Sequence, residues 1–387
     1  SYNCKKIIIK SRGNMDKIMV VIGTRPEAIK MGPLIKCMEK ESLEVITVTT
    51  GQHKEILNNV LDMFEITPAY NLKLLKENQQ LEELAARILM EMNPILKKEQ
   101  PTVVLVHGDT ITTFAVALAA FYKKIPVGHV EAGLRTNKKY SPFPEEMNRV
   151  LTDDIAELYF APTEESQRNL INEGHPKEKI FVTGNTGIDA LKYTLTDTYN
   201  LQKIIPTDPN KKMILVTMHR RENWGAPMDR VFQTINRLTS ERKDIEFLFS
   251  VHPNPIVRDK VFNYFDHNSQ VHIVDALDVV GFHNVMNASY MILTDSGGIQ
   301  EEAPSMGKPV LVLRDTTERP EGVAAGTLKL VSTDPQKIYE NVIQLLDDKD
   351  AYNKMAERAN PYGTGYSSEV ITTILKKYMI EKGNEEK

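Results

Sequence analysis

A chain of 387 residues exceeds what one hydrophobic core usually supports, because single cores stop growing at roughly 250–300 residues, and two domains are therefore expected. Apolar residues make up 41% of the chain, charged residues make up 26%, and the net charge of -4 excludes a strong basic field for nucleic acid or an anionic membrane. The two cysteines, Cys4 and Cys37, are too few for a disulfide framework or a thiolate metal site, which favours a reducing, cytoplasmic setting.

The first half of the chain alternates short apolar strands with amphipathic helices. Residues 1–14 are basic with only a short apolar stretch, and we expect them to be an extension or a cloning remnant outside the fold, before a natural start at Met15. Strands are expected at 18–22, 45–49, 103–106, 126–130, 158–161 and 180–183, and helices at 29–41, 53–64, 81–98 and 112–123. Near-continuous apolar strands between helices indicate a parallel sheet covered on both faces.

A polar stretch at 197–212 reads as a linker or an exposed loop, and the same alternation then restarts. Strands are expected at 213–218, 245–251, 271–274, 291–294 and 310–313, and helices at 227–241, 255–265, 299–306, 335–346 and 367–380. The predicted fold class is α/β, with two Rossmann-like domains facing across a cleft. The first is expected over 15–190, with a C-terminal helix in 367–387 packing back on it, and the second over 191–366. Ligands in such sheets bind outside the carboxyl ends of the strands.

Two strand-to-helix turns have residues suited to an anionic ligand. In the first, Arg25 and Lys30 follow the first strand and open a helix, although a plain turn with solvated charges is an alternative. In the second, Gly297 and Gly298 follow a strand and let a backbone approach a phosphate, with Glu302 about one turn later for ribose hydroxyls. A tight turn that needs glycine remains the alternative there.

Three acids stand at predicted strand ends or helix starts. Asp109 and Glu131 each come just after a strand, and Glu145 begins a helix after a proline. If the two strands are neighbours, Asp109 and Glu131 emerge side by side and can serve as acid and base. Helix capping is the alternative for any one of them.

A histidine and two arginines at 219–221 suit a diphosphate, or form a charged surface loop. His252 ends a later strand and, taken alone, suits a local hydrogen bond better, whereas Phe282 suits either a base or the core. No metal-ligand spacing, nucleophile elbow or dinucleotide fingerprint is found in the sequence, so no cofactor is expected.

Together these motifs resemble those of the non-hydrolysing UDP-N-acetylglucosamine 2-epimerases. The matching strings, in order over about residues 15–366, are GTRPE at 23–27, HGDT at 107–110, HVEAGLRT at 129–136, PEE at 144–146, HRREN at 219–223, DSGGIQEE at 295–302 and ERPEG at 318–322. The resemblance implies a glycosyltransferase-B-like architecture and a reaction without NAD or metal. It implies that UDP leaves as the C2 proton is removed, that a glycal forms, and that UDP then adds back.

The resemblance also assigns residues. It implies that the catalytic groups are Asp109, Glu131, Glu145 and His219. It implies contacts to the UDP-sugar from Arg25, Lys30, Arg135, Phe282, Ser296, Gly297, Gly298, Glu302 and Arg319. It further implies a UDP-sugar substrate, no nucleic-acid or membrane partner, and a homodimer.

Bacterial members resemble one another in a second, activating UDP-sugar site, to which Gln52, Glu55, Arg220 and His252 correspond. Glu55 and Asn78 replace a glutamine and an arginine usual there, so we expect weaker activation by the substrate. Three alternatives stay open at this level: a 2-epimerase of a related 6-deoxy UDP-sugar, a UDP-sugar glycosyltransferase, and a non-catalytic nucleotide-sugar sensor.

Overall fold

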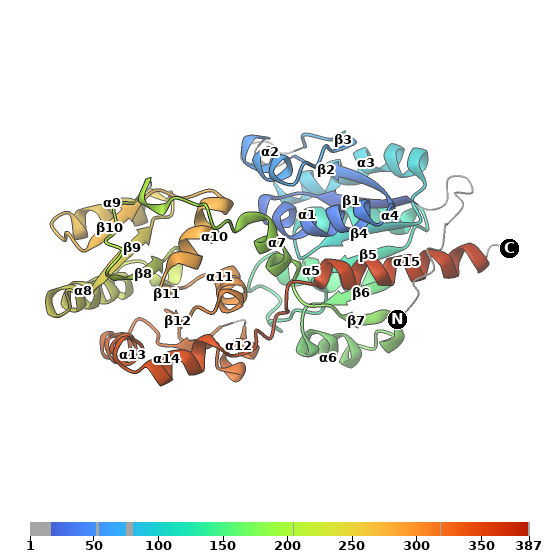
Figure 1. The fold of residues 1–387 in the computed structure, drawn as a ribbon. Coiled ribbons are helices and arrows are strands. Elements are labelled where there is room, and N and C mark those ends of the chain that lie inside the picture. Colours follow the sequence, from blue (N-terminus) through green and yellow to red (C-terminus); the bar gives the residue numbers. More distant parts are fainter. Residues whose placement is uncertain (1–16, 52–53, 75–79, 204, 318, 386–387) are drawn as a thin grey trace. The chain divides into compact units, whose positions relative to one another are not determined.

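The computed structural model describes residues 17–51, 54–74, 80–203, 205–317 and 319–385 (Figure 1). The described chain divides into two compact units. Unit 1 comprises the chain up to Thr186 together with the segment from Tyr366, and unit 2 comprises Gly187–Gly365. The chain therefore passes from unit 1 to unit 2 and back. The first fourteen residues, expected outside the fold, lie outside the described residues.

Unit 1 is built on a seven-stranded parallel sheet in the order β3-β2-β1-β4-β5-β6-β7. The strands are β1 (Lys17–Ile22), β2 (Glu44–Thr49), β3 (Tyr70–Asn71), β4 (Val103–His107), β5 (Val127–Val130), β6 (Leu158–Ala161) and β7 (Ile180–Val182). The central strands β1, β4, β5 and β6 are buried along nearly their whole length, which agrees with the predicted sheet covered on both faces.

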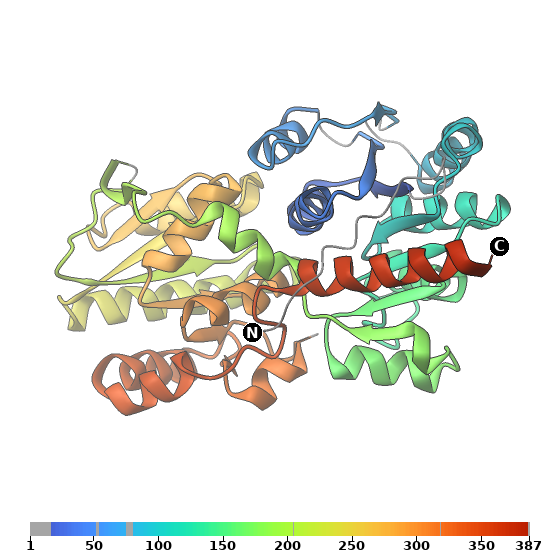
Figure 2. The same cartoon turned by 45° about the vertical axis from the view of Figure 1, so that its right-hand side comes forward.

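The helices of unit 1 pack in two groups. They are α1 (Arg25–Lys40), α2 (Lys54–Met63), α3 (Leu81–Glu99), α4 (Ile111–Tyr122), α5 (Glu145–Ile155), α6 (Glu164–Asn172) and α15 (Ser367–Glu385). Helix α7 (Thr186–Thr194) begins at the boundary between the units and lies in unit 2 from Gly187 onward. Helices α2 and α15 contact α1, whereas α4 packs between α3 and α5. Figure 2 shows α15 beside α1, where Lys376 pairs with Glu41.

Helix α1 begins at Arg25, four residues before the predicted start. The Thr24 hydroxyl accepts from the Glu27 amide, and the Glu27 carboxylate in turn accepts from the Thr24 amide. This reciprocal cap, with a proline in the first turn, adds a helical turn that an apolar periodicity cannot detect.

Unit 2 has a six-stranded parallel sheet in the order β10-β9-β8-β11-β12-β13. Its strands are β8 (Lys212–Thr217), β9 (Ile245–Ser250), β10 (Val271–Val274), β11 (Met291–Thr294), β12 (Val310–Val312) and β13 (Leu328–Leu330). Its remaining helices are α8 (Ala226–Glu241), α9 (Pro255–Phe265), α10 (Val279–Ala288), α11 (Gly297–Glu302), α12 (Pro320–Ala325), α13 (Pro335–Asp347) and α14 (Lys349–Ala356).

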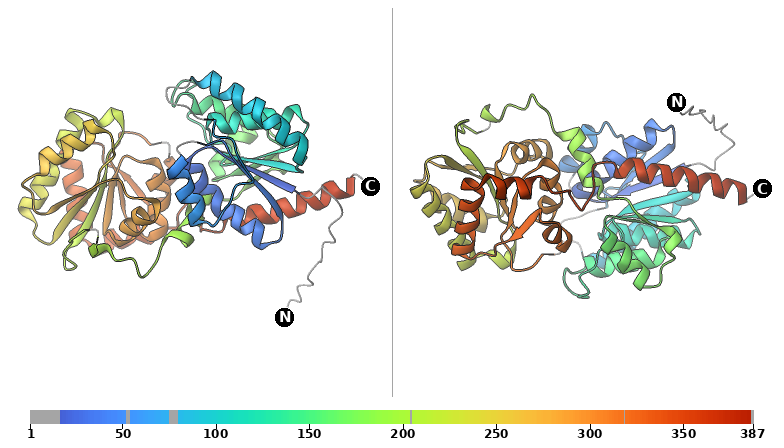
Figure 3. Two further views of the ribbon diagram at one scale, coloured as in Figure 1. Left: turned by 90° about the horizontal axis from the view of Figure 1, so that it is seen from above. Right: turned by 60° about the horizontal axis from the view of Figure 1, so that its bottom comes forward.

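Alternate residues of each strand in unit 2 enter two different cores. Along β8, Ile214 and Val216 pack toward α8, α9 and α13, whereas Met213 and Leu215 pack toward α10 and α11. Helices accordingly lie on both faces of the sheet (Figure 3). Helices therefore cover both faces of the sheet, and the ends of the strands remain accessible to a ligand.

The polar stretch at 197–212 lies wholly inside unit 2, and the structure places the first boundary between the units earlier, at 186/187. Leu201–Lys203 forms a 3-10 turn, and β8 begins at Lys212. Short elements such as β3, β13 and α12 escaped the sequence prediction, because they are too short for a periodicity to mark. None of the described helices is both long and apolar enough to cross a membrane.

Candidate active site

Each sheet has one topological switch point, where the chain leaves two neighbouring strands in opposite directions. In unit 1 this point lies between β1 and β4, and in unit 2 between β8 and β11. Open α/β sheets bind ligands outside the carboxyl ends of the strands at such points. The loops after these four strands contain Arg25, Asp109, His219 and Ser296. The candidate residues therefore lie at the strand ends where open α/β sheets bind their ligands.

The two basic residues of the first turn have different surroundings. Arg25 is exposed at the start of α1, where the amides of Gly23, Thr24 and Glu27 are already taken up by the Thr24–Glu27 cap. Lys30 lies one turn later and its ammonium pairs with the carboxylate of Glu131. Arg25 is therefore open to an anionic ligand, whereas Lys30 acts through Glu131.

Glu131 is buried and tightly held. It follows β5 with a left-handed backbone, φ 68°, which a residue with a side chain adopts only when its surroundings impose it. Besides Lys30, its carboxylate meets Arg149, with Nη2 3.2 Å from Oε1. Burial opposes the ionised form, but Lys30 and Arg149 together hold the pKa of Glu131 well below its usual range. Glu131 is an anion across the neutral pH range.

Asp109 and Glu131 lie close together, as adjacent strands require. Strands β4 and β5 are paired, with His107 opposite Val130, and the two acids follow these residues. The Arg149 guanidinium from α5 contacts both carboxylates, and Asn148 donates to the Asp109 carbonyl at 3.0 Å. Arg149 thus offsets the repulsion between two neighbouring anions. About a third of the Asp109 side chain, 31%, remains exposed and accessible to a ligand.

Glu145 begins α5 one turn before Arg149. Residues four apart lie on the same face of a helix, so Glu145 stands on the face that carries Arg149 to Asp109 and Glu131. Its side chain is half-buried, in the first turn, where a carboxylate is favoured by the helix dipole. The three predicted acids therefore share one edge of unit 1.

His107 lies beneath this acid group and stays neutral. Its Nε2 lies 3.6 Å from Glu131 Oε2, and its ring is buried. Burial, with Lys30 and Arg149 nearby, lowers the pKa of His107 to about 3, although Glu131 opposes the shift. At neutral pH the ring is therefore a polar but uncharged wall of the site.

A buried network supports the loop that carries Glu131. His129 Nδ1 lies 2.6 Å from Asp153, and its Nε2 donates to the Gly108 carbonyl at 2.7 Å. Asp153 also accepts from the Gly133 amide and pairs with Arg135 at 2.7 Å. The network ties the loops after β4 and β5 to α5.

Arg135 does not fit the substrate-binding role expected for it. Its side chain is 2% exposed and is held between Asp153 and Glu173, both at 2.7 Å. A guanidinium already paired with two carboxylates would have to lose them to reach a phosphate. We therefore assign Arg135 to the support of the loop rather than to the substrate.

The lowered pKa of Glu131 predicts acid sensitivity. A depressed pKa contributes stability above the ordinary value of 4.5, and this stability is lost as the pH falls through the folded-state pKa. The difference in free energy of unfolding between wild type and Glu131→Gln should therefore be full at neutral pH and shrink below pH 4.5. Urea titrations across acidic pH measure it. A difference that stays constant across that range contradicts the assignment.

In unit 2, Asp295 organises the loop after β8. It is completely buried after β11 and accepts from the His219 and Arg220 amides and from Asn223 Nδ2, at 2.9–3.1 Å. His219 Nδ1 lies 3.0 Å from Asp295 Oδ1. Although burial opposes it, these hydrogen bonds hold the pKa of Asp295 below its usual range. Asp295 therefore fixes the His219 ring with Nε2 as its remaining polar atom.

The ring of His219 stacks on that of His252, with centroids 5.7 Å apart and planes 18° apart. Burial and the neighbouring His219 lower the pKa of His252, against the pull of Asp295. The His252 Nδ1 accepts from the Asn254 amide. His252 thus does more than bond locally, because it also forms one side of the His219 environment.

Two arginines border the glycine pair at the start of α11. A Cβ built on Gly297 would lie 3.7 Å from Arg319 Nη2 and 4.0 Å from Arg220 Nη2, whereas one built on Gly298 would meet nothing within 4 Å. Ser296 occupies the N-cap position of the same turn, half-buried and without a side-chain capping hydrogen bond. Guanidinium groups next to a glycine backbone, which has no side chain in the way, are suited to binding a diphosphate.

The substitution Gly298→Ala should change stability and ligand affinity in opposite directions. Gly298 has room for a methyl group within a helical turn, so alanine should raise the free energy of unfolding by up to about 1 kcal/mol. The same methyl group should block the close approach of a diphosphate and weaken UDP binding at least about tenfold. Denaturant unfolding and titration calorimetry with UDP measure the two effects.

The matched control is Gly383→Ala in α15, another helical glycine whose Cβ would meet nothing within 4 Å. It should raise stability in the same way and leave UDP affinity unchanged. Undiminished UDP affinity in Gly298→Ala rules out ligand contact at this turn.

Comparison with known proteins identifies the family of this chain. A family model described as UDP-N-acetylglucosamine 2-epimerase matches residues 35–376. The chain is 50% identical to the UDP-N-acetylglucosamine 2-epimerase of Bacillus subtilis, over 95% of this chain and 97% of that protein. The chain belongs to the UDP-N-acetylglucosamine 2-epimerase family. A Neisseria meningitidis structure of such an epimerase bound to UDP-GlcNAc has a TM-score of 0.85 and 47% identity, covering 93% of this chain and 100% of that one.

Family membership agrees with a glycosyltransferase-B-like α/β fold made of two Rossmann-like units. Sequence reasoning missed three residues that shape the site: Arg149, Asp153 and the anchoring role of Asp295. The helix that the sequence predicts after Pro144 places Arg149 one turn after Glu145, and this spacing is the signal that could have found it. Asp153 and Asp295 could not be found in this way, because their partners are 18 to 76 residues away.

Three of the activator-site predictions cannot be located. Gln52 and Asn78 lie outside the described residues, and the side chain of Glu55 in α2 is not described either. Arg220 and His252 lie together with His219 in unit 2, as described above. Activation by a UDP-sugar in this member of the family therefore stays a prediction.

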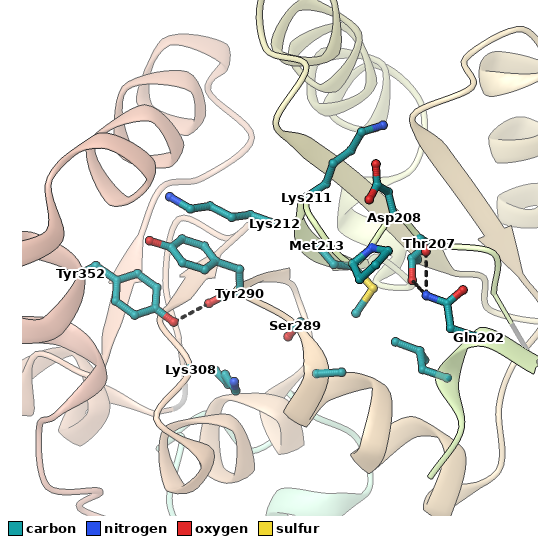
Figure 4. Close-up of a pocket in the computed structure, with 13 residues that line it drawn as sticks. Gln202, Thr207, Asp208, Lys211, Lys212, Met213, Ser289, Tyr290, Lys308 and Tyr352 are labelled. Atoms are coloured by element: carbon teal, nitrogen blue, oxygen red, sulfur yellow. Dashed lines mark hydrogen bonds between the residues drawn. The ribbon is translucent and has the colours of Figure 1, made fainter. Parts of the chain in front are cut away.

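A separate cavity of about 420 Å³ lies at the opposite edge of the unit 2 sheet (Figure 4). It is lined by residues that precede or begin strands, among them Lys212, Tyr290 and Lys308. Its polar groups are largely occupied, since Lys212 donates to the Leu346 carbonyl at 2.8 Å and Tyr352 donates to the Tyr290 carbonyl at 2.8 Å. We do not assign it to the family's reaction. In the described part of the chain, no cluster of histidine, cysteine and acidic side chains is arranged to hold a metal.

Proposed function

We propose that the chain catalyses the reversible epimerisation of UDP-N-acetylglucosamine at C2, giving UDP-N-acetylmannosamine. The observation that carries the proposal is the group of acids after β4 and β5 in unit 1, where Glu131 stays ionised beside Asp109. Proton transfer at carbon needs such groups, and binding of a nucleotide alone does not. Membership of the epimerase family supports the same reaction.

The chemistry is an elimination followed by an addition. A carboxylate removes the C2 proton, the C–H electron pair becomes the C1–C2 double bond, and the C1–O bond breaks so that UDP leaves with its electron pair. The intermediate is 2-acetamidoglucal. UDP oxygen then adds to C1 and C2 takes a proton on the opposite face. Because C2–H is a weak acid, the leaving diphosphate must be stabilised as the bond breaks.

The proposed roles follow from the local surroundings. Proton transfer is assigned to Asp109, Glu131 and Glu145. The Nε2 of His219 is assigned to the diphosphate region, and Lys30 to the orientation of Glu131. The residues proposed to bind UDP are Arg25, Ser296, Gly297, Gly298, Glu302 and Arg319. Phe282, also proposed to contact the UDP-sugar, packs with part of its surface on the apolar core between α10 and the sheet.

Incubation with UDP-N-acetylglucosamine in deuterium oxide tests the proposal. NMR should show UDP-N-acetylmannosamine appearing with deuterium at C2, with no other substrate present. A glycosyltransferase or a non-catalytic sensor would leave C2 unlabelled, which would refute the proposal. A preference for a 6-deoxy UDP-sugar over UDP-N-acetylglucosamine in the same assay would support that alternative substrate.

A homodimer and a cytoplasmic setting are also proposed, on the family resemblance and the low cysteine content. Sedimentation equilibrium should give about twice the 43.9 kDa chain mass, and the chain mass alone would contradict it.

We further propose weak activation by the substrate. The velocity curve should be close to hyperbolic, and a strongly sigmoidal curve that Gln52→Ala abolishes would contradict this expectation.

A further inference from the structure

The carboxylate of Glu302 has a buried histidine beside it. His283, on α10, has 4% of its side chain exposed, and its Nε2 lies 3.3 Å from Glu302 Oε2. Its other ring nitrogen, Nδ1, lies 2.7 Å from the hydroxyl of Thr194 at the end of α7. The three side chains therefore form a row from α7 through α10 to the end of α11, all within unit 2.

The row has one consistent direction of hydrogen donation. An ionised carboxylate only accepts, so a hydrogen bond between the two groups, which are 3.3 Å apart, requires the proton on the His283 Nε2 that faces Glu302. In a neutral ring Nδ1 is then an acceptor, and the Thr194 hydroxyl can donate to it. Thr194 thereby selects the tautomer that presents an N–H to Glu302.

The position of the histidine is itself fixed. The next residue, Asn284, donates to the Thr194 carbonyl at 2.7 Å and accepts from the Thr196 amide at 3.1 Å. Asp278 caps the start of α10 by accepting from the Gly281 amide at 2.7 Å. Helix α10 is thus fastened to the end of α7, and His283 has little freedom to move away from Glu302.

We propose that His283 is a positioning residue that holds Glu302 ready to accept a hydrogen bond from a ribose hydroxyl, and that it thereby sets the preference for a ribonucleotide. The inference rests on the proposed UDP-binding role of Glu302. Glu302 Oε2 faces His283, so Oε1 remains for the ligand, and 16% of the side chain stays exposed. A glutamate held in one rotamer loses less conformational freedom on binding than a free one.

The test compares affinities for UDP, 2′-deoxy-UDP and 3′-deoxy-UDP by titration calorimetry. Wild type should bind UDP at least about tenfold more tightly than one of the analogues, the range expected for a hydrogen bond to a carboxylate. His283→Leu should weaken UDP binding about three- to tenfold and leave that analogue almost unaffected, so that the ratio falls toward one. His283→Gln, which retains an N–H donor, should restore part of the ratio.

Thr194→Val removes the hydroxyl without touching the histidine and should lower the ratio in the same direction. It also serves if His283→Leu fails to fold. An equal loss of affinity for UDP and both analogues would mean a structural role only and overturns the proposal, as does an unchanged ratio in folded variants. A wild type that shows neither UDP binding nor deuterium exchange refutes the proposed function itself.

Discussion

Glu131→Gln should lower kcat by about 10²–10⁴-fold, the contribution typical of a positioned acid or base. The substitution keeps the shape of the side chain but removes the charge that faces Lys30 and Arg149. The half-buried Lys30 and the buried Arg149 then lose a shared anion, so the free energy of unfolding should also fall by about 3–5 kcal/mol. Deuterium exchange at C2 and denaturant unfolding measure the two losses.

Asp109→Asn is the matched comparison. Its side chain is partly exposed, and Arg149 keeps Glu131 as a partner, so the loss of stability should stay within about 1 kcal/mol. Its loss of kcat should nevertheless be similar, about 10²–10⁴-fold. UDP affinity should change by less than about threefold in both variants, since the diphosphate groups are untouched. Full activity in either folded variant removes that acid from the proposed mechanism.

Asp295→Asn should lower kcat by about 10²–10⁴-fold although Asp295 is buried and is not proposed to touch the substrate. Asparagine replaces one of the two acceptor oxygens by an NH₂ group, which is a donor. In one orientation this group faces the His219 ring, and in the other it faces the Arg220 amide and Asn223 Nδ2, which are donors too. The ring then loses the partner that sets its tautomer. Unpaired buried donors should also cost about 1–3 kcal/mol of stability.

The pH dependence of kcat distinguishes positioning from a merely structural effect. If Asp295 acts through His219, the pH profile of kcat should change shape in Asp295→Asn, and kcat should fall more than KM rises. The control is Asp348→Asn, because Asp348 also accepts from two backbone amides, those of Asp350 and Ala351, but has no histidine partner. Its kcat should be unchanged. An equal effect of both substitutions contradicts the role assigned to Asp295.

Local pattern was sufficient for much of the fold. The apolar run Ile18–Ile22 lies in β1 as predicted, and the alternation of runs and helices requires parallel sheets, because consecutive parallel strands need a crossover helix. Turn residues such as Gly297 and Asp109 could be placed at strand ends for the same reason. Apolar spacing alone places the start of α1 four residues late, since it does not register the cap formed by Thr24 and Glu27, although this pair stands in the sequence with the spacing of a capping box.

What the sequence by itself determined was thus the class of fold, the loops that hold the candidate residues, and the resemblance to an epimerase family. Only the tertiary structure decided which of those residues are engaged with protein partners and which remain open to a ligand. In the folded chain Arg135 pairs with Asp153 and Glu173, Arg149 lies between two acids, and Asp295 contacts the His219 ring. Such pairings join residues that are distant in the chain, and the free energy of a buried charge depends on these distant partners rather than on its neighbours in sequence.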